Sequence, residues 1–326
     1  MKKKAPQSAK LRGYHLPSQS IILKPVSPFS FDLSARIFSE GDREIRSYQG
    51  GRFTQLICVD GTLIHLSLES RGTVDVPELR AELTSERRLS EAEEKTAAEI
   101  VNVLFNLHFD PEPFYKAVKR DPTMTHITRR LRGLRSLTTQ TVFEALLDSI
   151  VEQQISLKVA NSLERRLVKR FGETLTVCNE VFYAYPTAER LASASVEDLR
   201  ACGLSQRKAE YIKEIATLVA SGKLDLEKFK TYSSAEEVVK ELDEVRGIGT
   251  WTAELTVLRS MRKWDAFPAD DLGLRRLIAH YYCREKGVTS AEAREIAELW
   301  GKWKGLAAYY LVVAEIVGIE PECAVT

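Results

Sequence analysis

A pair of carboxylates late in the chain stands where a charged reaction intermediate could be stabilised. Asp270 and Asp271 follow Pro268 and directly precede an apolar run, LGLRRLIAHYY. Because proline interrupts a preceding helix and Asp is a preferred N-cap residue, we expect Asp271 at the start of a new helix. A carboxylate held in this way can stabilise positive charge that develops in a transition state. A helix cap without any catalytic role would show the same pattern, so residue type alone leaves both interpretations open.

A glycine turn, Gly247-Ile248-Gly249, lies upstream of these carboxylates. Glycine tolerates positive φ and the close approach of another backbone, which predicts a tight hairpin between two helices. The second helix should begin near Thr250, where unpaired amides and the positive end of the helix dipole suit a phosphate. We therefore expect the amides of Gly247, Gly249 and Thr250 to contact a nucleic-acid backbone, a contact that sets register without reading sequence. The alternative is a turn that only joins two helices.

The order and spacing of residues 245–277 resemble the helix-hairpin-helix, Gly-Pro-Asp superfamily of DNA glycosylases. The Gly-Pro-Asp ending of that superfamily stands here as Phe267-Pro268-Ala269-Asp270-Asp271. Three further segments, VEQQIS, PTAERLASASVEDLRACGLSQRKAEYI and GKWKGLAAYYL, occur in the same order in its AlkA-type, alkylpurine branch. The resemblance implies a base-excision repair enzyme for alkylated purines such as 3-methyladenine and 7-methylguanine. It also implies that Asp271 is the catalytic carboxylate and that Asp270 is a cap or a supporting residue.

The implied reaction breaks the N-glycosidic bond of a nucleotide that has been flipped out of the duplex. Bond cleavage passes through an oxocarbenium-like state, which Asp271 would stabilise while it orients or deprotonates the attacking water. An alkylated purine carries a positive charge and leaves without a general acid. One carboxylate therefore suffices, and we expect no catalytic cofactor.

Trp251 decides between the branches of this superfamily. In the bifunctional branches a Lys occupies this position and attacks the sugar as an amine, so a Trp implies a monofunctional enzyme without lyase activity. An indole face also suits a cationic base, through an attraction of roughly 0.5–2 kcal/mol. A second wall of the base pocket falls at Leu255 and a third near Val312, and both are aliphatic where the alkylpurine branch has aromatic residues. Oxidised or deaminated bases are therefore the alternative substrates, and packing of the hairpin helix is the alternative role of Trp251.

The segment Gln153-Gln154-Ile155 matches the wedge that fills the hole left by the flipped base, with Gln154 at the intercalating position. The segment interrupts a long apolar pattern, so it should form a bend between two helices. Residues of a bend packed inside the bundle are the alternative. Glu152 and Glu254 lie near the wedge and Trp251 in sequence; each could add negative charge to the pocket or form a salt bridge.

The resemblance further implies a monovalent cation, Na⁺ or K⁺, held at the hairpin by the backbone carbonyls of Asp243, Val245 and Gly247. Basic side chains near the hairpin and near Asp271 are candidate phosphate ligands. These are Arg246, Arg207, Lys208 and Arg275. If they bind phosphate, DNA affinity should fall steeply with salt. A further basic cluster is expected to be a solvated face and consists of Arg129, Arg130, Arg132 and Arg135.

The pattern along the chain predicts an α+β protein. Residues 1–17 should form a basic, disordered tail, and residues 18–108 an N-terminal α+β domain with a small antiparallel β-sheet, including a hairpin at Asp60-Gly61. From about Leu83 onward the pattern is helical. Residues 109–326 should form a predominantly α-helical bundle that contains the helix-hairpin-helix motif, with two helical subdomains and the active-site cleft between them. Long apolar helices are expected to close the chain.

Composition limits the remaining possibilities. The net charge is +1, so any affinity for DNA must come from local patches. The 5 cysteines are scattered, which predicts neither a disulfide framework nor a zinc site nor an iron–sulfur cluster. The chain contains no apolar run of about eighteen residues, so we expect no membrane contact. The resulting expectation is a monomer acting on double-stranded DNA with damaged bases, cytoplasmic and nucleoid-associated, or nuclear in a eukaryote. A non-catalytic helix-hairpin-helix DNA-binding protein remains as an alternative, although it would have no use for Asp271.

Overall fold

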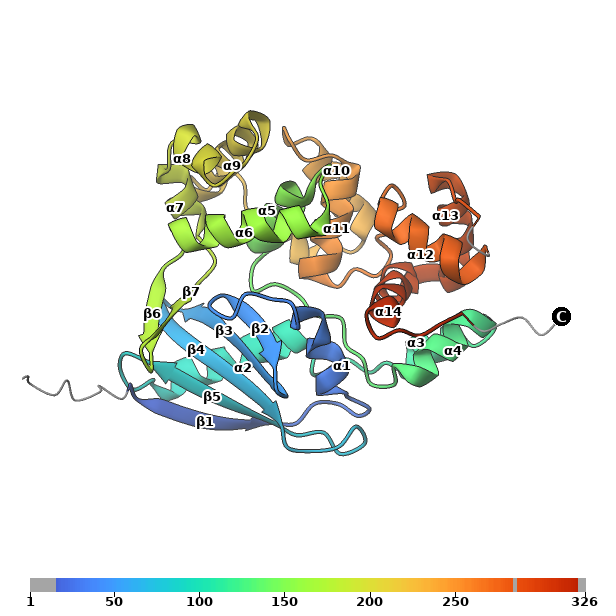
Figure 1. Ribbon diagram of the computed structural model, residues 1–326, viewed down its shortest axis with the longest axis horizontal. Coiled ribbons are helices and arrows are strands. Elements are labelled where there is room, and N and C mark those ends of the chain that lie inside the picture. Colours follow the sequence, from blue (N-terminus) through green and yellow to red (C-terminus); the bar gives the residue numbers. More distant parts are fainter. Residues whose placement is uncertain (1–15, 284–285, 322–326) are drawn as a thin grey trace, which may run out of the picture.

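The computed structural model describes residues 16–283 and 286–321 (Figure 1). The basic tail expected at residues 1–17 therefore lies almost entirely outside the described residues. No helix in the described part of the chain combines the length and the apolarity needed to cross a bilayer.

A five-stranded antiparallel sheet forms the N-terminal part, with the strand order β1-β5-β4-β3-β2. Its strands are β1 (Ser18–Leu23), β2 (Arg46–Gln49), β3 (Arg52–Val59), β4 (Thr62–Ser70) and β5 (Leu79–Ser85). Asp60 and Gly61 both have positive φ, 47° and 78°, so the predicted tight turn between β3 and β4 is confirmed.

Strand β5 contradicts the helical pattern predicted from Leu83 onward. Leu79, Ala81 and Leu83 are fully buried on one face of the sheet, and β5 pairs with both β1 and β4. Apolar and polar residues alternate in LRAELTS, as in a strand. Charged, helix-favouring residues follow directly, so the end of the alternation is hard to recognise in the sequence. Pairing on both sides decides the conformation of this segment.

Helix α2 (Glu91–Phe105) covers the inner face of the sheet. Ser90 and Glu93 form a complete capping box at its start. The first helix, α1 (Phe31–Ala35), continues as the short 3-10 helix η1 (Arg36–Phe38). Phe53 of β3 meets Phe105 of α2 edge to face at 5.0 Å, which places the core between these two layers.

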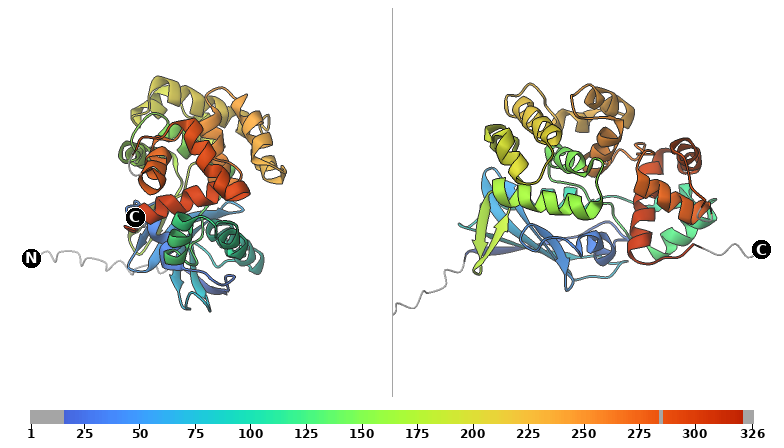
Figure 2. Two further views of the ribbon diagram at one scale, coloured as in Figure 1. Left: turned by 90° about the vertical axis from the view of Figure 1, so that its right-hand side faces the viewer. Right: turned by 45° about the horizontal axis from the view of Figure 1, so that its top comes forward.

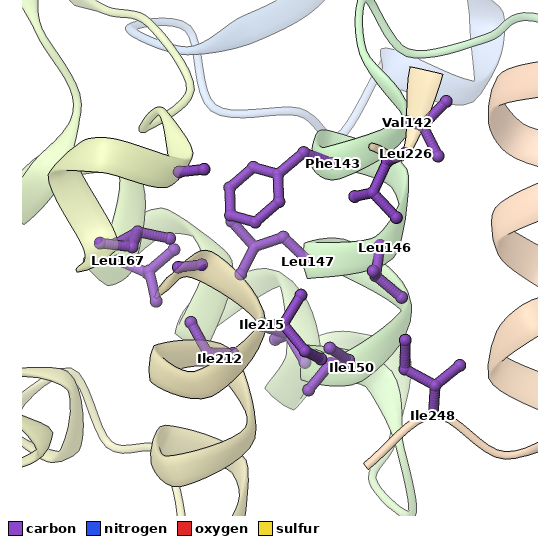
Figure 3. Packing of buried hydrophobic residues seen from close by; sticks show 14 of the residues in the cluster. Val142, Phe143, Leu146, Leu147, Ile150, Leu167, Ile212, Ile215, Leu226 and Ile248 are labelled. Atoms are coloured by element: carbon purple, nitrogen blue, oxygen red, sulfur yellow. The ribbon is translucent and has the colours of Figure 1, made fainter. Parts of the chain in front are cut away.

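The central helices surround a second core (Figure 3). They are α5 (Val142–Glu152), α6 (Leu157–Phe171), α7 (Ala188–Ser193), α8 (Val196–Ala201), α9 (Gln206–Ala220), η2 (Glu227–Thr231), α10 (Ala235–Asp243) and α11 (Thr250–Met261). Leu147 and Ile150 of α5 point toward Ile212 and Ile215 of α9 in this core.

A third core joins two segments that are far apart in sequence (Figures 1 and 2). It packs α3 (Glu112–Ala117) and α4 (Pro122–Arg130) against α12 (Leu272–Tyr282), α13 (Ser290–Ala297), η3 (Glu298–Trp303) and α14 (Lys304–Ile316). The expectation of long apolar helices at the end of the chain is confirmed for α14, which has 13 residues, but not for the segment before it. Gly301 has φ 53° and ψ −131°, a conformation essentially confined to glycine, and it breaks the segment at a kink.

A small hairpin, β6 (Thr174–Val177) and β7 (Glu180–Tyr183), interrupts the region predicted to be helical. Cys178 and Asn179 form its turn with φ values of 50° and 67°. Leu175 and Phe182 pack on Leu56 of the sheet, so the hairpin attaches the central helices to the sheet (Figure 2). The sequence signal was weak because short strands become stable only when they are paired.

A buried group of charges also joins the sheet to the helices. We call this group the sheet–helix ion cluster; its members are Arg46, Glu144, Asp148, Glu164 and Tyr185. Arg46 of β2 lies 3.0 Å from Glu144 of α5 and 3.9 Å from Asp148. Burial raises the pKa of both carboxyls, and Arg46 opposes that shift. The arginine is therefore the main compensation for several buried carboxyls.

Candidate active site

Asp271 lies at the point where the central and C-terminal helices meet. It is the N-cap of α12, and its Oδ1 accepts a hydrogen bond from the Leu274 amide at 2.7 Å. Its Oδ2 accepts a hydrogen bond from the Trp251 indole Nε1 at 3.1 Å. The predicted helix cap is therefore confirmed, and both carboxylate oxygens have fixed N–H partners. Trp251 belongs to α11 of the second core, so this contact connects two separately packed groups of helices.

The loop before Asp271 is supported from behind by Arg294 of α13. Its Nη1 lies 3.3 Å from the Phe267 carbonyl oxygen and 3.4 Å from Glu254 Oε1, so it connects the loop to α11. Asp270 accepts a hydrogen bond from Ser290 Oγ at 2.6 Å and lies 4.0 Å from Arg294 Nη2. The salt-bridge interpretation of Glu254 thus holds. Burial raises the pKa of Glu254 to about 7, and Arg294 limits that rise.

The hairpin between α10 and α11 adopts the predicted glycine turn. Gly247 has φ 93°, and a Cβ at this position would lie 2.4 Å from Cγ of the Tyr211 ring, so only glycine fits. Gly249 is the N-cap of α11 in extended conformation and supplies no capping side chain. The first amides of α11, at the exposed Thr250 and at Trp251, therefore remain available to an anion.

The predicted wedge forms the turn between α5 and α6. Gln154 has φ 56° and is exposed, and Ile155 is 36% exposed. Gln153 lies differently: its Nε2 donates to the Gly247 carbonyl oxygen and to Thr252 Oγ1, both at 3.0 Å. In this structure only Gln154 and Ile155 of the three face outward. The side chain of Gln153 connects the turn to the hairpin.

The four candidate phosphate ligands are in different environments. Arg207 is exposed at the start of α9. Arg246 is exposed but lies 3.0 Å from Glu214, and Arg275 Nε donates to the Val288 carbonyl at 2.7 Å. Lys208 is half-buried, and its Nζ donates to the carbonyl oxygens of Val151 at 2.8 Å and Gln153 at 2.7 Å. The lysine ammonium thus already has protein partners.

The members of the basic cluster that was expected to be a solvated face also lie in different environments. Arg135 is completely buried, and its Nη2 donates to the Val26 carbonyl at 2.9 Å, so the expectation is wrong for this residue. Glu152, near the wedge, pairs with Arg259 at 2.8 Å, as the salt-bridge interpretation requires. These partners lie far away in sequence, and no local pattern indicated them.

The two positions expected to form walls of the base pocket are partly exposed to solvent. Leu255 is half-buried on α11, and Val312 of α14 is 38% exposed. Two cavities of the described residues lie elsewhere. One, of about 460 Å³, lies between the β6–β7 hairpin and the outer sheet face. The other, of about 250 Å³, lies beside the sheet–helix ion cluster. Neither cavity is lined by Asp271 or Trp251.

Comparison with known proteins agrees with this arrangement. A family model described as "HhH-GPD superfamily base excision DNA repair protein" matches residues 147–302. The DNA-3-methyladenine glycosylase of Bacillus subtilis (strain 168) is 33% identical over 229 residues, which is 70% of this chain and 75% of that protein. The structure of 3-methyladenine DNA-glycosylase from Archaeoglobus fulgidus has a TM-score of 0.80 at 29% identity, over 90% of this chain and 98% of the other. Schizosaccharomyces pombe 3-methyladenine DNA glycosylase (Mag1) in complex with abasic DNA has a TM-score of 0.51 at 29% identity, covering 60% of this chain and 94% of the other.

The chain therefore belongs to the HhH-GPD superfamily of base excision DNA repair proteins. DNA is its macromolecular partner, and the hairpin, the wedge turn and Asp271 lie in the segment that the family model matches. Within the superfamily it is a DNA glycosylase similar to enzymes that are named for 3-methyladenine.

Proposed function

We propose that this protein is a monofunctional DNA N-glycosylase that excises alkylated purines of the 3-methyladenine and 7-methylguanine type. The observation that carries the proposal is the hydrogen bond from the Trp251 indole to Asp271. An indole beside the carboxylate can stack on a cationic base but cannot form a Schiff base with the sugar. The names of the similar glycosylases support the same substrate class.

Asp271 acts on the sugar in this proposal. As the N-glycosidic bond breaks, positive charge develops on the sugar ring, and a carboxylate held by two N–H donors needs little reorganisation to stabilise it. The alkylated purine leaves as a neutral base with the bonding electrons. Water then adds to the sugar carbon, and Asp271 orients that water or accepts its proton.

Trp251 forms the main aromatic wall of the base pocket, and Leu255 and Val312 form aliphatic walls. Stacking on one indole contributes roughly 0.5–2 kcal/mol toward a cationic base. Oxidised or deaminated bases are neutral and gain less from this face. The enzyme therefore prefers cationic lesions, and neutral lesions serve as the comparison substrates.

The hairpin and the wedge turn hold the DNA. Amides of Gly247, Gly249 and Thr250 bind a phosphate, and Arg207 with Arg246 adds positive charge nearby. Gln154 and Ile155 enter the space left by the flipped base.

A monovalent cation at the hairpin carbonyls is part of the proposal. The Gly247 carbonyl accepts from Gln153 and the Val245 carbonyl accepts from the Ile248 amide at 3.0 Å. A carbonyl oxygen has two lone pairs, so each keeps one for a cation, and the Asp243 carbonyl would be the third ligand. The ion would supply positive charge next to the bound phosphate. Replacing K⁺ by tetramethylammonium at constant ionic strength should then weaken binding to abasic duplex DNA, whereas equal affinity in both salts would remove the ion from the proposal.

The first test is the release of free bases from methylated duplex DNA by the purified protein, resolved by chromatography. Release of 3-methyladenine or 7-methylguanine by the native protein supports the proposal, and DNA with oxidised or deaminated bases is assayed in parallel. Preferential release of those neutral bases would replace the substrate class. Borohydride trapping tests the monofunctional mechanism, because a covalent protein–DNA adduct would refute it. Light scattering of the DNA complex tests whether one monomer acts alone.

A further inference from the structure

The turn between α5 and α6 is fixed from two sides by side chains of other segments. From α9, Lys208 Nζ donates to the carbonyl oxygens of Val151 and Gln153, at 2.8 and 2.7 Å. From the turn itself, Gln153 Nε2 donates to the Gly247 carbonyl and to Thr252 Oγ1, both at 3.0 Å. The same residue, Gln153, is thus held through its backbone by α9 and through its side chain by the hairpin.

The contacts of Lys208 lie at the C-terminal end of α5, where backbone carbonyls require hydrogen-bond donors from outside the helix. The last carbonyls of α5 have no partner within the helix, and the negative end of its dipole favours a cation. Burial lowers the pKa of Lys208 and Glu152 raises it, so a half-buried ammonium is retained beside an acid. An ammonium with two short carbonyl contacts gains less from a DNA phosphate than an exposed one, because it would have to give up those contacts.

The turn has a backbone conformation that requires support. Gln154 has φ 56°, in the left-handed region that residues with a Cβ seldom adopt. Such conformations persist where the surrounding structure holds them and commonly occur at functional sites. Without Lys208 or Gln153, the residue after the helix end would be free to relax, and the exposed side chain of Gln154 would lose its direction.

We propose that Lys208 and Gln153 are positioning residues that hold the wedge turn in fixed register with the phosphate-binding hairpin, and that Lys208 is not a phosphate ligand. This inference rests on the proposed function. Gln154 can fill the space left by a base only if its distance from the bound phosphate is set in advance. Lys208 fixes the turn to α9, and Gln153 fixes it to Gly247 of the hairpin.

The experiment compares three Lys or Arg to Met variants on the full chain. Lys208→Met removes the ammonium and keeps most of the stem, Arg207→Met removes the neighbouring exposed charge, and Lys223→Met is the control at an exposed position beyond α9. Each is examined for thermal unfolding, for the salt dependence of affinity for a duplex with an abasic analogue, and for wedge insertion. Insertion is read from the fluorescence of 2-aminopurine placed opposite the abasic analogue.

We expect Lys208→Met to keep the native salt slope and to lose most of the 2-aminopurine response. Its single-turnover excision should fall on the order of 10- to 100-fold, because small misplacements in an active site have effects of this size. Arg207→Met should instead lower the salt slope by about 1, as loss of one phosphate contact does. Lys223→Met should match the native protein in every measurement.

A native 2-aminopurine response in Lys208→Met, or a salt slope lowered as in Arg207→Met, would overturn the inference. If Lys208→Met does not fold, Gln153→Ala serves as the second variant, since it leaves the ammonium and breaks the contact with Gly247. It should lose the same response, and a native response would again overturn the inference. The fluorescence readout needs no bond cleavage, so it decides this inference even where the native protein fails to excise alkylated bases, the result that would refute the proposed function.

Discussion

Replacing Asp271 by Asn removes one negative charge and one hydrogen-bond acceptor while changing shape very little. In the native protein both partners of the carboxylate are donors, the Leu274 amide and the Trp251 indole. An amide has a single accepting oxygen, so one of these two N–H groups must lose its partner or turn to water. Asn is nevertheless as good an N-cap as Asp. The expected loss of stability is about 1 kcal/mol, the value of one hydrogen bond between partly exposed groups.

The expected loss of activity is much larger. A carboxylate within about 4 Å of a developing positive charge, in a partly exposed site with an effective dielectric of about 20, stabilises it by about 4 kcal/mol. Since about 1.4 kcal/mol corresponds to a tenfold change in rate, Asp271→Asn should slow the chemical step by about a thousandfold. The much smaller loss of stability cannot explain such an effect.

The assay is single-turnover release of base from a methylated duplex with enzyme in excess, together with affinity for a duplex that carries an abasic analogue. We expect the affinity to survive and the rate to fall. Asp270→Asn is the matched control, because Asp270 bonds to Ser290 and not to Trp251, and its loss of rate should be far smaller. A loss of less than about tenfold in Asp271→Asn, with binding intact, would contradict the electrostatic role assigned to this residue.

Three further predictions concern pH, the ion cluster and the hairpin. The pKa of Glu254 is raised from 4.5 to about 7, so the folded state binds this proton more tightly and the free energy of unfolding falls by ~3 kcal/mol as pH rises between these values. Glu254→Gln should flatten this part of the curve of melting temperature against pH, and an unchanged slope would refute the raised pKa of Glu254. Arg46→Met leaves the buried carboxyls of the sheet–helix ion cluster without their main compensating charge, so urea unfolding near neutral pH should show a loss of about 3–5 kcal/mol in the free energy of unfolding. The loss should be smaller in acid, where those carboxyls are protonated, and an equal loss at both pH values would count against this reasoning. Gly247→Ala adds a Cβ 2.4 Å from the Tyr211 ring and should lower both the free energy of unfolding and the affinity for DNA. The control Gly222→Ala, at φ 71° with open space around it, should show only the backbone strain of about 1–2 kcal/mol, and equal losses in the two variants would refute the steric argument.

Features that depend on residues within a few positions of one another were predicted correctly. The Asp60-Gly61 turn, the turn with Gly247 at φ 93° and the cap at Asp271 all belong to this group. Each depends on the side chain or the φ angle of one or two residues, so the local sequence contains all the information that it needs.

Features that depend on distant partners were missed. The β6–β7 hairpin and strand β5 exist because other strands or apolar side chains cover them. Arg135 was expected in solvent and lies in the core, because the Val26 carbonyl, far from it in sequence, accepts from its guanidinium. A charged residue in a sequence shows that it needs partners, but the local pattern does not show which they are.

The sequence by itself determined the class of protein and the parts of the site that are local: the carboxylate at a helix start, the glycine hairpin, and an indole where a lysine would bring different chemistry. Only the tertiary structure decided how these parts are joined. It placed the Trp251 indole on Asp271, turned Gln153 toward Gly247, and directed Lys208 to the end of α5 instead of toward solvent. The physical reason is that a hydrogen bond or ion pair between distant segments depends on how whole helices pack against one another. Each local pattern supplies only one of the surfaces that meet in a core, so it does not determine that packing.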